Sequence, residues 1–97
     1  MKALFISYNQ AITERIDAFL DNEGIRGYTL FPLTYGRGSH TGEPHMGDHT
    51  WPAMNSTVIA MVEDSKIDRA MHVLREIDAE TQLQGMRTFV WNVEEQL

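Results

Sequence analysis

Two short stretches of nearly unbroken apolar sequence, residues 2–8 and 56–62, most constrain what this chain can fold into. Each has the length of a single β-strand. A strand that is apolar at almost every position is typical of the interior of a sheet, where both faces are covered. The two stretches therefore predict two central strands of one sheet.

Residues 28–35 and 86–93 show a different pattern, in which apolar and polar side chains alternate. Alternation predicts strands with one exposed face, and Pro32 within the first of them is tolerated only at the edge of a sheet. The apolar faces are marked by Phe31, Leu33 and Tyr35 in the first strand and by Phe89, Trp91 and Val93 in the second. These two stretches are predicted to be edge strands.

Apolar side chains recur at helical spacing in residues 12–20 and 67–77, which predicts two amphipathic helices. Ser65, followed three residues later by an acidic residue, offers a start signal for the second helix. Gly24 and Gly85 provide residues that accept a left-handed backbone at or beyond the helix ends. We expect three methionines to fill the core, namely Met61, Met71 and Met86.

The order of elements is βαββαβ, which predicts an α+β, ferredoxin-like domain over residues 1–97. Right-handed crossovers of this order give a four-stranded antiparallel sheet of order 4-1-3-2, with both helices on one face. A long loop joins strands two and three. Because two helices cover only one face while the central strands are apolar on both, the open face is expected to meet another copy of the chain.

Composition narrows the possible partners. The net charge of −6, without basic runs, disfavours binding to nucleic acid and insertion into a membrane. The chain has no cysteine, so it has neither a disulfide framework nor a thiolate metal site. The N-terminus runs directly into the first strand, so no targeting segment is expected, and the cytoplasm fits best.

Residues 36–53 form the loop, which holds four of the seven glycines and two of the three prolines. Hairpins usually close within about two to five residues, and a much longer loop in a compact domain is usually functional or disordered. We therefore expect the function to depend on this loop.

Three of the four histidines lie within the loop, close to two carboxylates. Imidazole and carboxylate groups bind Zn²⁺, Ni²⁺ or Cu²⁺. The candidate metal ligands are His40, His45, His49, Glu43 and Asp48. The spacing fits no regular element, and the alternative is a solvated, glycine-rich loop whose histidines make only local hydrogen bonds.

A second candidate site involves anions. Arg37 stands between Gly36 and Gly38, and together they could offer backbone N–H groups and a guanidinium to a phosphate. With Arg87, this segment could bind an adenine nucleotide or another small anion at a cleft between subunits.

Enzyme function is not favoured. Ser7 and Ser56 lie within strands, without the sharp glycine-flanked turn that a nucleophilic serine requires. The alternative from this class is a dimeric ferredoxin-like monooxygenase that uses Trp, His and Asn side chains around a pocket. The residues available for such a pocket are Trp51, Trp91, His72 and Asn9.

The chain resembles the PII signal-transduction superfamily over essentially its whole length. The sequence Gly-Ile-Arg-Gly-Tyr-Thr-Leu at 24–30 resembles the entry to that family's second strand. Tyr-Gly-Arg-Gly at 35–38 resembles the start of its T-loop, and residues 64–77 resemble its second helix. The resemblance implies a regulatory trimer whose loops contact a membrane transporter or an enzyme and respond to a small effector.

The sequence departs from classical members at residues 80–87, which lack the Thr-Gly-x-x-Gly-Asp-Gly-Lys pattern used there for nucleotides. It is more similar to shorter PII-like branches, such as CutA-like proteins and those associated with heavy-metal efflux pumps. A metal effector would agree with the histidines of the loop.

Overall fold

The computed structural model describes residues 1–37, 44, 46 and 54–97. Within these residues there are six helices and strands, and two 3₁₀ turns, η1 and η2, precede α1 and β4. In chain order the elements are β1 (Lys2–Asn9), η1 (Gln10–Ile12), α1 (Thr13–Asn22), β2 (Tyr28–Thr34), β3 (Asn55–Val62), α2 (Asp64–Glu80), η2 (Gln82–Gln84) and β4 (Arg87–Asn92).

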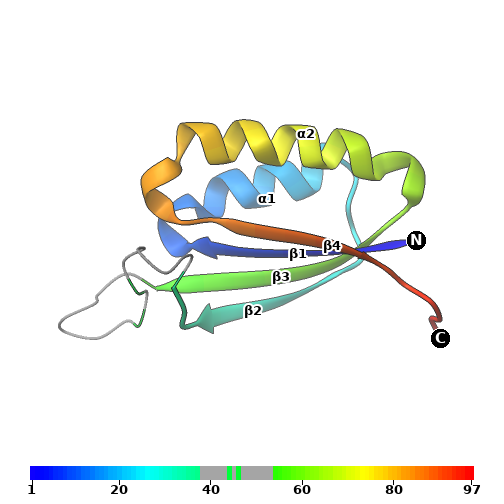
Figure 1. The fold of residues 1–97 in the computed structure, drawn as a ribbon, viewed down its shortest axis with the longest axis horizontal. Coiled ribbons are helices and arrows are strands. Elements are labelled where there is room, and N and C mark those ends of the chain that lie inside the picture. Colours follow the sequence, from blue (N-terminus) through cyan, green and yellow to red (C-terminus); the bar gives the residue numbers. More distant parts are fainter. Residues whose placement is uncertain (38–43, 45, 47–53) are drawn as a thin grey trace.

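The four strands form one sheet in the order β2-β3-β1-β4, which is the predicted order counted from the other edge. All three neighbouring pairs are antiparallel. Both helices lie on one face of the sheet, and no helix of the described residues lies on the other face (Figure 1). The ferredoxin-like prediction is therefore confirmed, including the two central apolar strands and the two edge strands.

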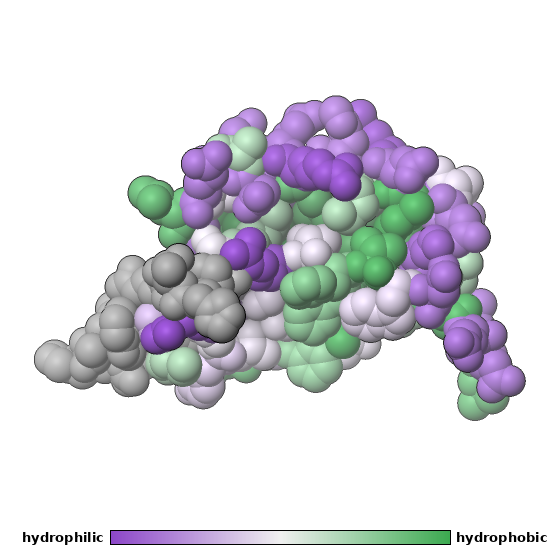
Figure 2. All heavy atoms as spheres, viewed as in Figure 1, coloured by the Kyte–Doolittle hydropathy of each residue, from purple (hydrophilic) through white to green (hydrophobic). Residues whose placement is uncertain are grey.

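The core lies between the helices and the sheet. Alternate residues of the central strands point into it, and they are buried almost completely. The helices add the apolar stripes expected from their spacing, while Figure 2 shows hydrophilic residues over their outer surface. The main core residues are Leu4, Ile6, Tyr8, Ile16, Phe19, Leu20, Val58, Ala60, Val62, Ala70, Leu74 and Ile77.

Helix α1 ends just before the glycine that the sequence predicts for its C-terminus. Gly24 adopts a left-handed φ of 66°. Its N–H donates to the carbonyl of Asp21 at 3.1 Å, and the N–H of Ile25 donates to the carbonyl of Leu20 at 2.8 Å. This is the Schellman pattern, in which the residue after the glycine also contacts the helix through its apolar side chain. Ile25 is accordingly buried.

The start of α2 differs from the prediction. The helix begins at Asp64 rather than at Ser65, and no side chain caps its first turn. Glu63 is extended and leaves β3 directly, and its carbonyl accepts a bond from the N–H of Lys66 at 2.9 Å. The chain thus enters the helix before Ser65 can act as a cap.

The alternation of side chains between the two faces of the sheet is interrupted in β2. Phe31 pairs with Thr57, but Thr34 pairs with Asn55, so two residues of β2 stand opposite one residue of β3. This is the count of a β-bulge, which shifts the alternation of side chains by one position. The predicted single face of Phe31, Leu33 and Tyr35 is therefore wrong beyond Pro32.

The open face of the sheet is rich in apolar side chains. Phe89 and Trp91 are 56% and 49% exposed on it. Met61 lies on the same face and is 43% exposed, so the prediction that Met61 fills the core is wrong, whereas Met86 is buried as expected. The alternation of β3 explains the difference, because Met61 pairs with Ala3 on the side away from the helices.

Candidate ligand-binding pocket

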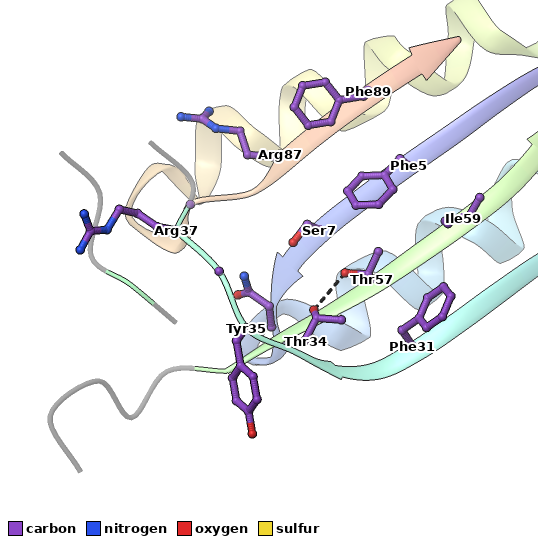
Figure 3. Close-up of a pocket in the computed structure, with 13 residues that line it drawn as sticks. Phe5, Ser7, Phe31, Thr34, Tyr35, Arg37, Thr57, Ile59, Arg87 and Phe89 are labelled. Atoms are coloured by element: carbon purple, nitrogen blue, oxygen red, sulfur yellow. Dashed lines mark hydrogen bonds between the residues drawn. The ribbon is translucent and has the colours of Figure 1, made fainter. Parts of the chain in front are cut away.

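A pocket of about 590 Å³ lies on the open face, at the end of the sheet from which residues 38–53 depart. All four strands contribute to it, together with the chain that follows β2 and the turn that precedes β4 (Figure 3). The lining residues are Phe5, Ser7, Phe31, Thr34, Tyr35, Gly36, Arg37, Asn55, Thr57, Ile59, Gly85, Arg87 and Phe89.

Strand register sets the order of these side chains. One row across the sheet contains Phe31, Thr57, Ser7 and Arg87, because each is the pairing partner of the next. Partners in a register pair point to the same face of a sheet. This row runs across the sheet from edge strand β2 to edge strand β4, and it brings the hydroxyl groups of Thr57 and Ser7 close to the guanidinium of Arg87.

The next row toward the middle of the sheet is apolar. It contains Ile59, Phe5 and Phe89, which are again successive partners. The rings of Phe5 and Phe89 lie 6.1 Å apart, centroid to centroid. The pocket floor therefore changes from polar near the loop end to aromatic further along the sheet.

A hydrogen bond fixes the side chains in the polar part of the pocket. The hydroxyl groups of Thr34 and Thr57 lie 2.9 Å apart, which joins the edge strand β2 to the central strand β3 (Figure 3). Thr57 and its strand neighbour Asn55 are both about 5–6% exposed. Polar side chains that are buried and hydrogen-bonded in this way have fixed orientations.

Two arginines lie at the loop end of the pocket. Arg37 follows β2 and Arg87 begins β4, so two segments far apart in the chain bring positive charge to one place (Figure 3). Gly85, with a left-handed φ of 71°, allows the turn that leads into β4. At Gly36 a side-chain Cβ would meet Asn55 Nδ2 at 3.8 Å, an ordinary contact, so lack of space is not the reason for glycine there.

The predicted anion-binding residues are thus partly brought together. Gly36, Arg37 and Arg87 all line the pocket. Gly38 lies outside the described residues, as do the predicted metal ligands His40, Glu43, His45, Asp48 and His49. Among the residues that the structure does describe, no three His, Asp or Glu side chains gather as they would around a metal ion. Metal binding by the loop stays a prediction.

The residues considered for an oxygenase do not share a site. Trp91 pairs with Ala3 on the open face, whereas Asn9 lies at the opposite end of β1 and accepts a bond from the N–H of Ala11. His72 lies on α2, where Nε2 is 2.7 Å from Glu76 Oε1, and its side chain is 63% exposed. Trp51 lies outside the described residues.

Sequence reasoning did not identify Ser7, Thr34, Asn55 or Thr57 as pocket residues. A signal was present, because Ser7 and Thr57 interrupt otherwise apolar central strands with polar side chains. Their shared face depends on the β1–β3 register, in which they are direct partners. Register is set by long-range pairing, which a single sequence pattern does not give.

Comparison with solved structures shows that the chain has a PII-like fold. The structure superimposes on CPII, a nitrogen regulatory PII-like protein from Thiomonas intermedia K12 bound to ADP, AMP and bicarbonate. The TM-score is 0.77 at 23% identity, over 95% of this chain and 84% of that one.

Two further structures are similar. CPII bound to ADP and bicarbonate gives a TM-score of 0.75 at 24% identity, again over 95% of this chain and 84% of the other. A PII-like signalling protein from Thermus thermophilus gives 0.61 at 20% identity, over 95% and 85%. No protein-family model matches the chain, and no curated protein sequence matches it.

Neither α1 nor α2, the two α-helices in the described part of the chain, has the length and apolarity required to cross a membrane.

Proposed function

We propose that this chain is a PII-like regulatory protein that binds an adenine nucleotide in the pocket at the base of residues 36–53. The observation that carries the proposal is the polarity gradient of the pocket. Arginine and hydroxyl groups lie at the loop end, and Phe5 and Phe89 lie toward the middle of the sheet. A nucleotide has the same division between a charged phosphate end and a flat base.

The polar and aromatic parts of the pocket suggest a role for each group of residues. Arg37 and Arg87 are placed to contact the phosphates, because guanidinium groups form charge-assisted hydrogen bonds with phosphate oxygens. The aromatic floor is placed to contact the base, which is stabilised by stacking and by loss of apolar surface. The similar CPII structures, which hold ADP, AMP and bicarbonate, support this choice of ligand.

The remaining open face suits self-association. Met61, Ala3 and Trp91 form a further row of register partners that does not line the pocket. A second copy packed on this row would leave the pocket at the edge of the junction between subunits. We propose a trimer as the working assembly, in which residues 36–53 contact a partner protein and nucleotide binding alters that contact.

The effector that this proposal favours differs from the one that the sequence favours. The histidines of the loop favour a metal ion, whereas the pocket and the ligands of the similar structures favour a nucleotide. The two proposed sites have no residue in common, so both can be tested on the same protein.

The test is isothermal titration calorimetry with ADP, AMP and ATP, each with and without bicarbonate. We expect saturable binding of at least one nucleotide. Replacing Arg87 or Arg37 with Met should raise the Kd by about tenfold or more, since hydrogen bonds to charged groups contribute about 1.5–3 kcal/mol. Arg26→Met is the matched control, because Arg26 is exposed and does not line this pocket.

Absence of binding for all three nucleotides would contradict the proposal. An equal loss of affinity in the Arg26 variant would show that overall charge, rather than the pocket, determines binding.

A further inference from the structure

The carbonyl of Pro32 accepts two side-chain hydrogen bonds. Gln10 Nε2 donates to it at 2.7 Å, and Ser56 Oγ donates to it at 2.9 Å. A carbonyl oxygen has two lone pairs, so both are used here. Gln10 belongs to η1 and Ser56 to β3, so two other elements fix this one point of the edge strand.

Pro32 is also part of the β2 bulge. Pro32 and Leu33 together stand opposite Ser56, between the register pairs Phe31–Thr57 and Thr34–Asn55. A bulge re-aims every side chain that follows it, because strand side chains alternate with a period of two. Thr34 therefore shares the open face with Phe31 rather than facing the helices.

The pocket depends on this change of direction. Thr34 reaches the hydroxyl of Thr57 on the open face, and Tyr35, Gly36 and Arg37 follow it along the rim. Pairing without the bulge would place Thr34 on the helix side and would turn the following residues with it. The bulge is thus the local structure that brings Arg37 to the pocket.

Gln10 also contacts the other end of the connection. Its backbone N–H donates to the carbonyl of Met54 at 2.8 Å, immediately before β3. Gln10 therefore holds the chain both at Pro32, before residues 38–53, and at Met54, after them. The side chain of Ser56 lies on the helix side of the sheet, because Ser56 is two positions from the core residue Val58 in β3 and so shares its face.

We propose that Gln10 and Ser56 are positioning residues for the pocket. Through the Pro32 carbonyl they hold the bulge that aims Thr34 and Arg37 at the ligand, although neither residue lines the pocket itself. Where it concerns the ligand, this inference rests on the proposed function.

The test uses two variants that each remove one donor, Gln10→Met and Ser56→Ala. Backbone amide signals of Thr34, Gly36 and Arg37 are followed by NMR, and ADP affinity is measured by calorimetry. We expect these amides to shift in both variants. The Kd for ADP should rise about three- to tenfold, as for the loss of one hydrogen bond of typical strength.

Tyr8→Phe is the matched control. Tyr8 is buried, and its hydroxyl is hydrogen-bonded to Ser56. This variant removes a neighbouring bond but keeps both donors to Pro32. We expect lower stability with unchanged amide signals at residues 34–37 and unchanged ADP affinity, which separates positioning from a general loss of stability.

Unchanged amides at residues 34–37 in both donor variants would overturn the inference, as would the same shifts in Tyr8→Phe. If the unmodified protein fails to bind ADP, the nucleotide proposal falls. The amide signals still decide whether Gln10 and Ser56 hold the bulge.

Discussion

Phe5 in β1 and Phe89 in β4 lie against each other on the sheet face opposite α1 and α2, with ring centroids 6.1 Å apart and ring planes inclined at 54°. Trp91, which is also in β4, has its ring centroid 6.4 Å from that of Phe5, with ring planes inclined at 38°. About half of the surface of Phe89 and of Trp91 is exposed. A contiguous aromatic surface of this kind is typical of an interface rather than of a face in contact with water.

The first prediction concerns this surface. Trp91→Asp should convert the proposed trimer into monomers at micromolar concentration, because a carboxylate at the centre of an apolar interface loses its hydration without gaining a partner. Size-exclusion chromatography with light scattering measures the mass directly. Leu83→Asp is the control, since Leu83 is 97% exposed in η2 and does not lie on the sheet face.

A monomeric mass for the unmodified protein would contradict the interface assignment. So would a Trp91→Asp variant that keeps the oligomeric mass.

The sequence was sufficient to predict the topology because patterning and connectivity agree in this chain. The nearly continuous apolar runs became β1 and β3, which must be central in this topology, and Pro32 fell on the edge strand β2. Each of these predictions rests on local periodicity, which short strands and amphipathic helices show directly.

The pocket could not be predicted to the same extent. Arg37 and Arg87 were identified as a possible anion site, and the pocket brings them together. Thr34 was missed because its direction depends on the bulge at Pro32. That bulge is held by Gln10, a residue 22 positions away in the chain. Contacts of this range leave no periodic signal.

The second prediction concerns the end of α1. Gly24→Ala should destabilise the protein by about 1 kcal/mol, since a residue with a Cβ is strained at φ 66°. Gly27→Ala is the control, because no atom lies within 4 Å of an added Cβ and its φ is not positive. It should be neutral, or stabilising by about 0.4–1 kcal/mol through the unfolded state.

Urea denaturation followed by circular dichroism gives both values. Equal effects of the two substitutions would contradict the role of Gly24 in the Schellman motif.

The third prediction concerns the histidines of the loop. Titration of tag-free protein with Zn²⁺, Ni²⁺ and Cu²⁺ should show saturable binding that disappears when His40, His45 and His49 are all changed to alanine, because neutral imidazole is a common ligand of these ions. His72→Ala is the control, since His72 lies on α2 beside Glu76. Binding should then be retained.

No saturable binding by the unmodified protein would remove the metal from the set of effectors. It would leave the nucleotide proposal untouched.

The last prediction concerns Tyr8 and alkaline pH. Burial raises the pKa of the Tyr8 hydroxyl above its ordinary value of 10. A group with a raised folded-state pKa binds more protons when folded. Its contribution to stability is therefore complete below about pH 10 and is lost as the pH rises through the folded pKa.

Tyr8→Phe has no proton to lose at this position. At pH 8 it should be less stable than the unmodified protein by about 1 kcal/mol, the typical contribution of one hydrogen bond. That difference should shrink as the pH is raised toward 11, because only the unmodified protein must keep a buried hydroxyl protonated.

Urea unfolding at a series of pH values measures the difference in stability between Tyr8→Phe and the unmodified protein. Tyr35→Phe, which removes a hydroxyl at a position that is 60% exposed, is the control. A constant difference between Tyr8→Phe and the unmodified protein from pH 8 to 11 would show that burial of Tyr8 does not control its ionisation.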